Sequence, residues 1–153
     1  MAAYHAPYHA AVRAALEAAK ARYGVAILYD AHSIRSRIPF LFDGTLPDLC
    51  IGTADGTSCA ESLSEAAVEI ASKSARYSHV LNGRFKGGWT TRHYGQPSNG
   101  VHAIQMELAQ SAYLKTEAAP FAYDDNKAAA LRGVLAEILH RLEELAPDLK
   151  VTS

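Results

Sequence analysis

The sequence predicts an α/β protein in which helices cover both faces of a small sheet. Three segments carry apolar residues at helical spacing, and they alternate with short apolar runs typical of strands. The chain has 153 residues, of which 49% are hydrophobic and 20% charged, as in an ordinary globular protein. This length suits one domain, so we expect residues 1–153 to form a single unit.

The first two elements are expected before residue 31. Residues 4–23 form a helix pattern that stops at Gly24. The expected apolar face consists of Tyr8, Val12, Leu16, Ala19 and Tyr23. The run VAILYD over 25–30 then predicts a strand that is buried on both faces. The polar residues of DAHSIRSR follow it at once.

A second helix is expected over residues 60–76. Capping-box spacing joins Ser58 to Glu61 and Ser62 to Glu65. The residues expected to face inward are Leu63, Ala67, Ile70 and Ala71.

The last helix is expected to begin after Asp124 or Asp125 and to reach about residue 146, where Pro147 ends it. Its core stripe is Leu131, Leu135, Ile138, Leu142 and Leu145.

The remaining segments are expected to be two strands and two loops. Residues 78–81 and 101–108 read as strands. Residues 36–60 lack periodicity and contain several glycines and prolines, which predicts a long ordered loop. The polar, glycine-rich residues 82–100 predict a loop or an irregular hairpin.

Composition excludes several classes of function. The net charge of −1 does not favour binding to nucleic acid or to an anionic membrane. We find no apolar run of the roughly 20 residues that a membrane span needs, and the first residues do not resemble a secretory signal. Cys50 and Cys59 do not make a disulfide framework, so we expect a reduced, cytoplasmic protein.

Asp30 and His32 lie where the first strand ends, which is where open α/β sheets bind ligands. His32 could offer a ring nitrogen to zinc while Asp30 orients the ring. Alternatively, Asp30 caps a turn and His32 is an ordinary surface histidine. One histidine does not make a metal site, because catalytic zinc usually has three protein ligands.

Glu107 lies at the end of an apolar strand, where an unpaired charge is costly. Partial burial would raise its pKa towards the range of a general base. A strand-end glutamate bonded to a neighbour is the equally simple alternative.

Four basic residues are interleaved with Trp89 and Tyr94 in the glycine-rich segment. They are Arg84, Lys86, Arg92 and His93. Their number and the net charge favour an anionic small molecule over nucleic acid, since arginine pairs with carboxylates in a bidentate way. The alternative is a solvated loop whose arginines stack on aromatic rings.

The motifs DAHSIRS, LPDLCIGTADGTSC, NGRFKGG, TRHYG and HAIQMEL together resemble the N-formylglutamate deformylase (N-formylglutamate amidohydrolase) family. The resemblance runs in order from about residue 4 to residue 145. It implies a fold related to zinc carboxypeptidases and aspartoacylases, and zinc-dependent release of formate from N-formyl-L-glutamate during histidine degradation.

The resemblance also implies residue roles. His32 would be a zinc ligand with Asp30 behind it, and Glu107 would be the general base. The basic residues at 84–93, together with Arg35, would bind the carboxylates of the acidic substrate or stabilise the oxyanion.

Family members carry an upstream half that supplies further zinc ligands, and those motifs are absent from this sequence. We therefore expect the C-terminal portion of a deformylase (a fragment, a split gene product or a truncated reading frame) with little activity alone. An N-terminal half or a second copy could complete it. A non-catalytic carboxylate-binding module, or a zinc amidohydrolase of another N-acyl amino acid, remain alternatives.

Overall fold

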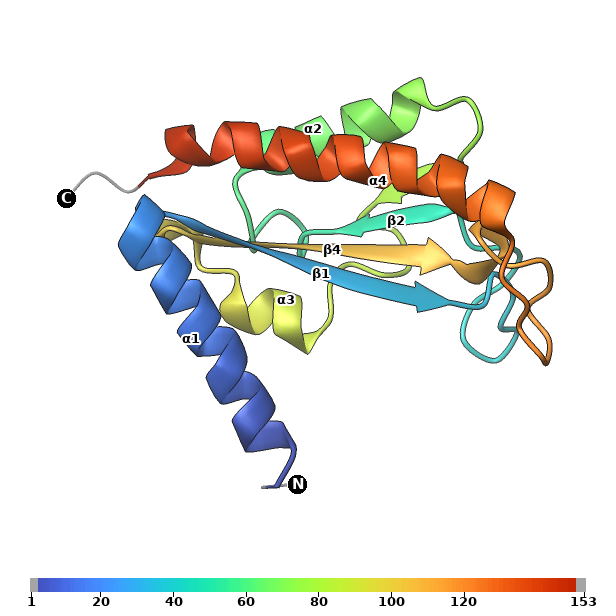
Figure 1. The fold of residues 1–153 in the computed structure, drawn as a ribbon, viewed down its shortest axis with the longest axis horizontal. Helices are drawn as coiled ribbons and strands as arrows, with labels where there is room; N and C mark the ends of the chain where they lie inside the picture. The colour runs from blue at the N-terminus through green and yellow to red at the C-terminus, as the bar shows by residue number, and fades with distance from the viewer. Residues whose placement is uncertain (1–2, 151–153) are drawn as a thin grey trace.

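The computed structural model describes residues 3–150, which form a four-stranded sheet between two layers of helices (Figure 1). The strands are β1 Ala26–Ile34, β2 Leu49–Gly52, β3 His79–Leu81 and β4 Val101–Ala109. The α-helices are α1 His5–Tyr23, α2 Glu61–Lys73, α3 Trp89–Tyr94 and α4 Asp125–Leu145. Helices α2 and α4 cover one face of the sheet, and α1 and α3 lie on the other (Figure 1). The expected helix–sheet–helix layering is therefore confirmed.

Strand β4 organises the sheet, whose order is β1-β4-β2-β3. It runs parallel to β1 over the whole of both strands and antiparallel to β2, while β2 and β3 are parallel. With neighbours on both sides, β4 is buried over most of its length.

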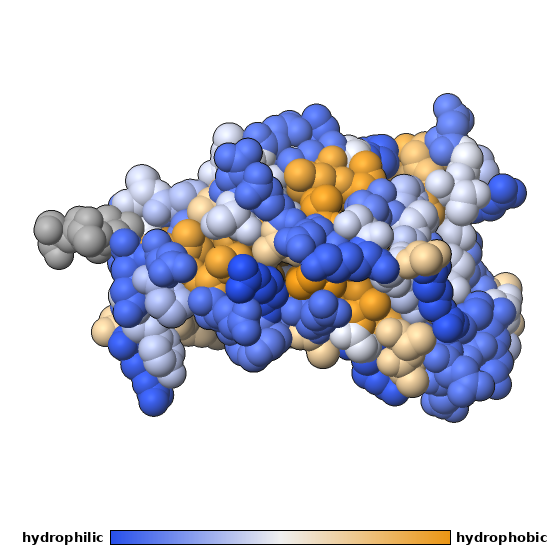
Figure 2. All heavy atoms as spheres, turned by 90° about the horizontal axis from the view of Figure 1, so that it is seen from above, coloured by the Kyte–Doolittle hydropathy of each residue, from blue (hydrophilic) through white to orange (hydrophobic). Residues whose placement is uncertain are grey.

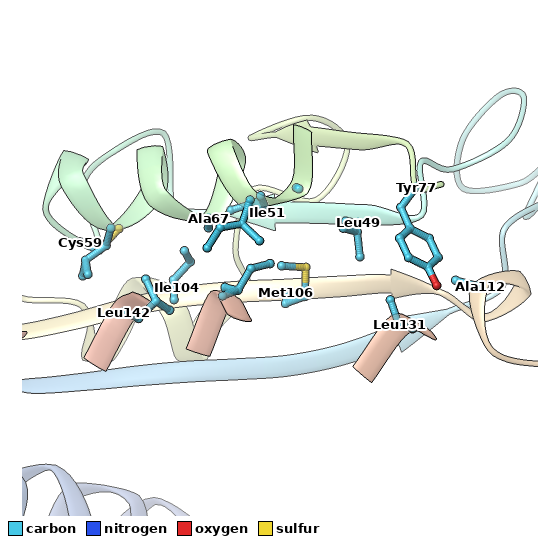
Figure 3. Close-up of a cluster of buried hydrophobic side chains, with 14 residues drawn as sticks. Leu49, Ile51, Cys59, Ala67, Tyr77, Ile104, Met106, Ala112, Leu131 and Leu142 are labelled. Atoms are coloured by element: carbon cyan, nitrogen blue, oxygen red, sulfur yellow. The ribbon is translucent and has the colours of Figure 1, made fainter. Parts of the chain in front are cut away.

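The main core lies between the sheet and the layer formed by α2 and α4. Figure 3 shows Ile51 of β2 and Met106 of β4 close to Ala67 of α2. All four α2 residues expected to face inward are buried. Along α4, Leu131, Ile138 and Leu142 are buried, and Leu135 and Leu145 are partly buried against the same cluster. The expected faces of both helices are confirmed.

The prediction that the first strand is buried on both faces is wrong. β1 lies at the edge of the sheet: its residues from Ile27 to Asp30 are only partly buried, and Ala31, His32 and Ser33 are exposed. It also extends through Ile34, beyond the apolar run, because pairing with β4 provides hydrogen bonds even for its polar residues. Asp30 and His32 are therefore within the strand.

The two segments expected to be loops contain regular structure. Residues 36–60 include β2, which is completely buried next to β4. Residues 82–100 contain the short helix α3 and a 3₁₀ turn at Pro97–Asn99, and do not form a hairpin. A strand of four residues and a helix of six are too short for periodicity to detect.

Of the expected N-terminal helix caps only one forms, whereas Gly24 ends α1 as expected. The side chain of Asp124 accepts hydrogen bonds from the backbone N–H groups of Asn126 and Lys127 at the start of α4. At α2, however, the N-cap residue is Ala60, and no side chain caps the helix. Ser58 donates its hydroxyl to the carbonyl of Ala103 instead, because it is buried against β4.

Candidate functional site

The pairing of β1 with β4 brings together the two residues singled out for chemistry. His32 is the register partner of Glu107, and Asp30 is the partner of Gln105. Paired positions on neighbouring strands share a face and are about 5 Å apart. Because side chains two positions apart point the same way, all four lie on the α3 side of the sheet.

His32 is oriented by Asp30. Its Nε2 lies 2.9 Å from the Oδ1 of Asp30, which leaves Nδ1 for another partner. The other carboxylate oxygen of Asp30 accepts a hydrogen bond of 3.3 Å from the hydroxyl of Thr91 in α3. The imidazole side chain is 49% exposed, so an external group can reach it.

Glu107 is buried, with 7% of the residue exposed. Burial raises the pKa of its carboxyl group; the nearby His32 opposes this rise and Asp30 adds to it. A desolvated carboxylate close to an imidazole suits a group that accepts a proton near neutral pH.

A close approach between two backbone segments holds the basic residues over the sheet. A Cβ placed on Gly52 of β2 would lie 2.6 Å from the backbone nitrogen of Gly87. Gly87 itself has φ +114°, a conformation that other residues rarely adopt. The N–H of Ala54 donates to the carbonyl of Lys86 at 2.6 Å and fixes the contact. The glycines of the two motifs thus let segment 84–88 cross β2.

A cavity of about 500 Å³ lies beside these residues. It is lined by His32, Arg84, Phe85, Lys86, Gly87, Gly88, Arg92, Gln105 and Glu107. Its rim is cationic: Arg84 donates to the carbonyl of Leu41, Lys86 pairs with Asp55 at 3.0 Å, and Arg92 donates to the carbonyl of Gly87. A negatively charged small molecule would fit this cavity electrostatically.

The structure places Arg35 and His93 outside this cavity. Arg35 follows β1 and is exposed. His93 projects from α3 towards α1 and stacks on Trp89, with the ring centroids 4.0 Å apart. Their substrate-binding roles remain predictions without a contact to the cavity.

Gln105 and Thr91 belong to the site but were not expected from the sequence. The Oε1 of Gln105 accepts a hydrogen bond of 2.7 Å from the N–H of Gly88 and so holds the glycine segment near β4. Gln105 is two positions before Glu107, so the alternation of a strand could have revealed it. Thr91, which is completely buried, reaches Asp30 only through the packing of α3 on the sheet.

The residues present supply only part of a zinc site. Within residues 3–150, no group of three or more His, Cys, Asp or Glu side chains could hold a metal ion. His32 offers one ring nitrogen with a carboxylate behind it, which is typical of a zinc ligand. A catalytic zinc ion usually needs three protein ligands, so the described residues alone do not fit the metal.

Comparison with known proteins identifies the family. The model of the N-formylglutamate amidohydrolase family matches residues 1–114. The chain belongs to this family. An N-formylglutamate deformylase from Pseudomonas aeruginosa is 52% identical over 136 residues, which cover 89% of this chain and 51% of the relative. An N-formylglutamate deformylase from Pseudomonas putida is 49% identical over 136 residues, which again cover 89% of this chain and 51% of the relative. The chain thus spans about half the length of the curated relatives it matches.

A solved N-formylglutamate amidohydrolase from Ralstonia eutropha JMP134 has the same fold over this region. The TM-score is 0.76 at 24% sequence identity, and the match covers 92% of this chain and 52% of that protein. The expected relation to zinc carboxypeptidases is not tested by these matches and remains a prediction. None of the helices between residues 3 and 150 is both long and apolar enough to cross a lipid bilayer.

Proposed function

We propose that this amidohydrolase-family chain carries one part of an active site that hydrolyses N-formyl-L-glutamate to formate and glutamate. The observation that supports this most directly is the pairing of His32 with the buried Glu107 at the wall of a cationic cavity. The proposed substrate, N-formylglutamate, is the one in the names of the two Pseudomonas relatives. We expect this reaction in the cytoplasm, where the buried free thiols of Cys50 and Cys59 stay reduced.

Glu107 is the proposed general base. Its carboxylate takes a proton from a water molecule while the water oxygen attacks the formyl carbon. The C–N bond then breaks, and Glu107 passes the proton to the leaving amine nitrogen. The raised pKa of Glu107 suits both transfers, because the group must accept and then release a proton near neutral pH.

The cationic residues of the cavity are the proposed substrate ligands. N-formylglutamate carries two carboxylates, and the cavity presents Arg84, Lys86 and Arg92. Arg92 is the best placed of the three for bidentate pairing, because its hydrogen bond to Gly87 fixes the guanidinium beside the cavity.

We further propose that zinc binds at His32, with its other ligands supplied from outside the described residues. Bound zinc would polarise the formyl carbonyl. The polypeptide that makes up the remaining length of the relatives is the proposed source of those ligands, which would make this chain the C-terminal portion of the enzyme. A second copy of the chain is the alternative source.

The test measures formate release by the chain co-expressed with the part of the Pseudomonas aeruginosa relative that it does not match. We expect zinc-dependent turnover of N-formylglutamate, with N-acetylglutamate as the comparison substrate. Glu107→Gln should lower kcat by about 10²-fold or more, whereas the exposed Glu65→Gln should leave it unchanged. Faster turnover of N-acetylglutamate than of N-formylglutamate would overturn the proposed substrate assignment.

The same assay on the chain alone should show little or no formate. Ordinary turnover by the chain alone would show that its own residues complete the site.

The incomplete ligand set favours a second candidate, a non-catalytic carboxylate-binding module. Calorimetry separates the two functions. Glutamate binding that is unaffected by chelator and by His32→Ala would support the binding module.

A further inference from the structure

The side chain of Glu117 joins the ends of the two strands that carry His32 and Glu107. Its Oε1 accepts hydrogen bonds from the backbone N–H of Ser36 at 2.7 Å and from that of Ser111 at 2.9 Å. Its Oε2 accepts the hydroxyl of Ser36 at 2.6 Å. Ser36 is buried, so its polar groups need such a partner. One carboxylate therefore contacts the chain just beyond β1 and just beyond β4.

The two serines occupy equivalent positions on the two strands. Ser36 is four residues after His32, and Ser111 is four residues after Glu107. Because His32 and Glu107 are register partners, the two serines continue the register of the parallel pair past its last paired residues. Strand ends open more readily than strand centres. A contact at this place therefore acts on the part of the sheet that holds both candidate functional side chains.

The segment that carries Glu117 is itself held in place. A β-bridge joins Leu114 to Tyr123 and closes the loop in which Glu117 lies. The ammonium group of Lys127, near the start of α4, donates to the carbonyls of Ser111 and Leu114. The carboxylate is therefore anchored to α4 while it contacts the ends of the two strands.

Ser36 also connects this contact to the apolar side of Glu107. The carbonyl of Ser36 accepts the N–H of Leu46 at 2.8 Å. Leu46 is buried in an apolar cluster with Cys50, which is the register partner of Glu107 in β2. A displacement of Ser36 would therefore disturb the surroundings of Glu107 as well as the end of β1.

The end of the molecule at which β1 and β4 finish has a mostly hydrophilic surface when seen from the side of α2 and α4 (Figure 2). Along β1 itself, Ala31, His32 and Ser33 are exposed. Apolar packing over this part of β1 is therefore limited. Hydrogen bonds to a charged carboxylate are stronger than those between neutral groups, so the contacts of Glu117 are well suited to fix the strand end.

We propose that Glu117 is a positioning residue for the pair formed by His32 and Glu107. It does not line the cavity, and it acts by fixing the end of β1 against the end of β4. This role rests on the proposed function, in which a proton moves between Glu107 and a water molecule near His32. A misplacement of about 1 Å can lower the rate of such a step about 10²-fold.

The first test measures hydrogen exchange in the chain alone. The amides of Leu28, His32 and Ile34 face β4 in the register of the two strands. In Glu117→Ala the amides of His32 and Ile34 should exchange at least about tenfold faster than in the wild type. Leu28, in the first half of β1, is the internal reference and should change less than about twofold.

Two further variants separate the reach of the side chain from its charge. Glu117→Gln keeps an oxygen for both N–H groups and an NH₂ group for the hydroxyl of Ser36, so it should exchange within about threefold of the wild type. Glu117→Asp keeps the charge but draws the carboxylate back by about 1.5 Å, so it should behave like Glu117→Ala. The exposed Glu65→Ala is the control for loss of a carboxylate, and the Tm of each variant checks that the fold is retained.

The second test measures formate release in the co-expression assay of the proposed function. Glu117→Ala and Glu117→Asp should lower kcat at least about tenfold, and Glu117→Gln should keep most of it. The KM for N-formylglutamate should stay within about threefold. This is expected because Lys86 and Arg92 are held by contacts that do not involve Glu117.

Three results would overturn the proposal. They are unchanged exchange at His32 and Ile34 in Glu117→Ala, an equal rise in exchange along the whole of β1, and selective opening of the strand end with an unchanged kcat. The second result would indicate a general loss of stability. If the wild-type complex releases no formate, the proposed function fails instead, and the exchange rates still decide whether Glu117 fixes the strand ends.

Discussion

His9 links α1 to α3 through a single buried side chain. Its Nδ1 lies 2.7 Å from the hydroxyl oxygen of Tyr94, and Trp89 packs edge-on against its ring. Burial lowers the pKa of His9, and the neighbouring His5, Arg13 and His93 lower it further. The folded chain therefore favours neutral His9.

A lowered pKa makes this contribution to stability depend on pH. The stability that neutral His9 contributes is fully present above pH 6.5, the pKa of histidine in the unfolded chain. It is lost as the pH falls through the lower pKa of His9 in the folded chain. Thermal unfolding, followed by the fluorescence of the single Trp89, should show a Tm that falls between pH 7 and pH 5. His9→Gln should reduce this fall, and the exposed His140→Gln should not. Equal falls in all three proteins would contradict the assignment.

Single residues differ in how far the sequence reveals them. The motifs of the family pointed to His32 and Glu107, and the structure places them on adjacent strands. Gln105 lies two positions before Glu107 on the same face of the strand, so strand alternation could have predicted it as a site residue. Thr91 was not, because its contact with Asp30 joins residues 61 positions apart through packing that no local pattern encodes.

At the scale of elements, α4 depends on its N-terminal cap. Asp124→Ala removes the acceptor of two backbone hydrogen bonds. We expect the Tm to fall by about 2–4 °C. The pKa of Asp124 is lowered, chiefly by the hydrogen bond from the N–H of Lys127. The difference in Tm between the wild type and Asp124→Ala should therefore be present above pH 3.8 and vanish at lower pH. Calorimetry with Asp125→Ala as the control checks this, since Asp125 does not cap the helix.

The crossing of segment 84–88 over β2 depends on Gly52. Gly52→Ala places a methyl group 2.6 Å from the backbone of Gly87, so the segment must move. We expect a loss of about 1–3 kcal/mol in urea unfolding. In the co-expression assay of the proposed function, kcat/KM for N-formylglutamate should fall as well.

Gly133 on α4 provides the contrast, because nothing lies within 4 Å of a Cβ placed there. Gly133→Ala should stabilise the chain by about 0.5–1 kcal/mol. Similar changes in stability for Gly52→Ala and Gly133→Ala would show that segment 84–88 can move away from β2 without a loss of stability.

Element prediction succeeded for the long segments, which show their period, and also for the short strand β3 His79–Leu81, which lies in the run expected at 78–81. The three long helices and β4 each span nine or more residues with one clear pattern. β2 failed because four consecutive buried residues carry no alternation, and its burial comes from β4, over fifty positions later in the chain.

For the whole molecule, the two cysteines report on unfolding. Burial raises the pKa of the Cys59 thiol to about 11 and, with Glu107 and Asp48 nearby, that of Cys50 to about 12. The reactive thiolate is therefore rare in the folded chain at pH 8. A thiol reagent should label neither cysteine quickly in buffer and both in denaturant. Rapid native labelling of one thiol would indicate local opening around it.

The strand order has a consequence for synthesis of the chain. Among the strands within residues 3–150, β4 is the last to leave the ribosome, yet it alone joins β1 to the β2–β3 pair. Until residues 101–109 emerge, the nascent chain holds two separate strand groups with no common partner. Cooperative folding of residues 3–150 therefore has to wait until β4 has been synthesised, and the apolar segments made earlier are exposed to aggregation until then.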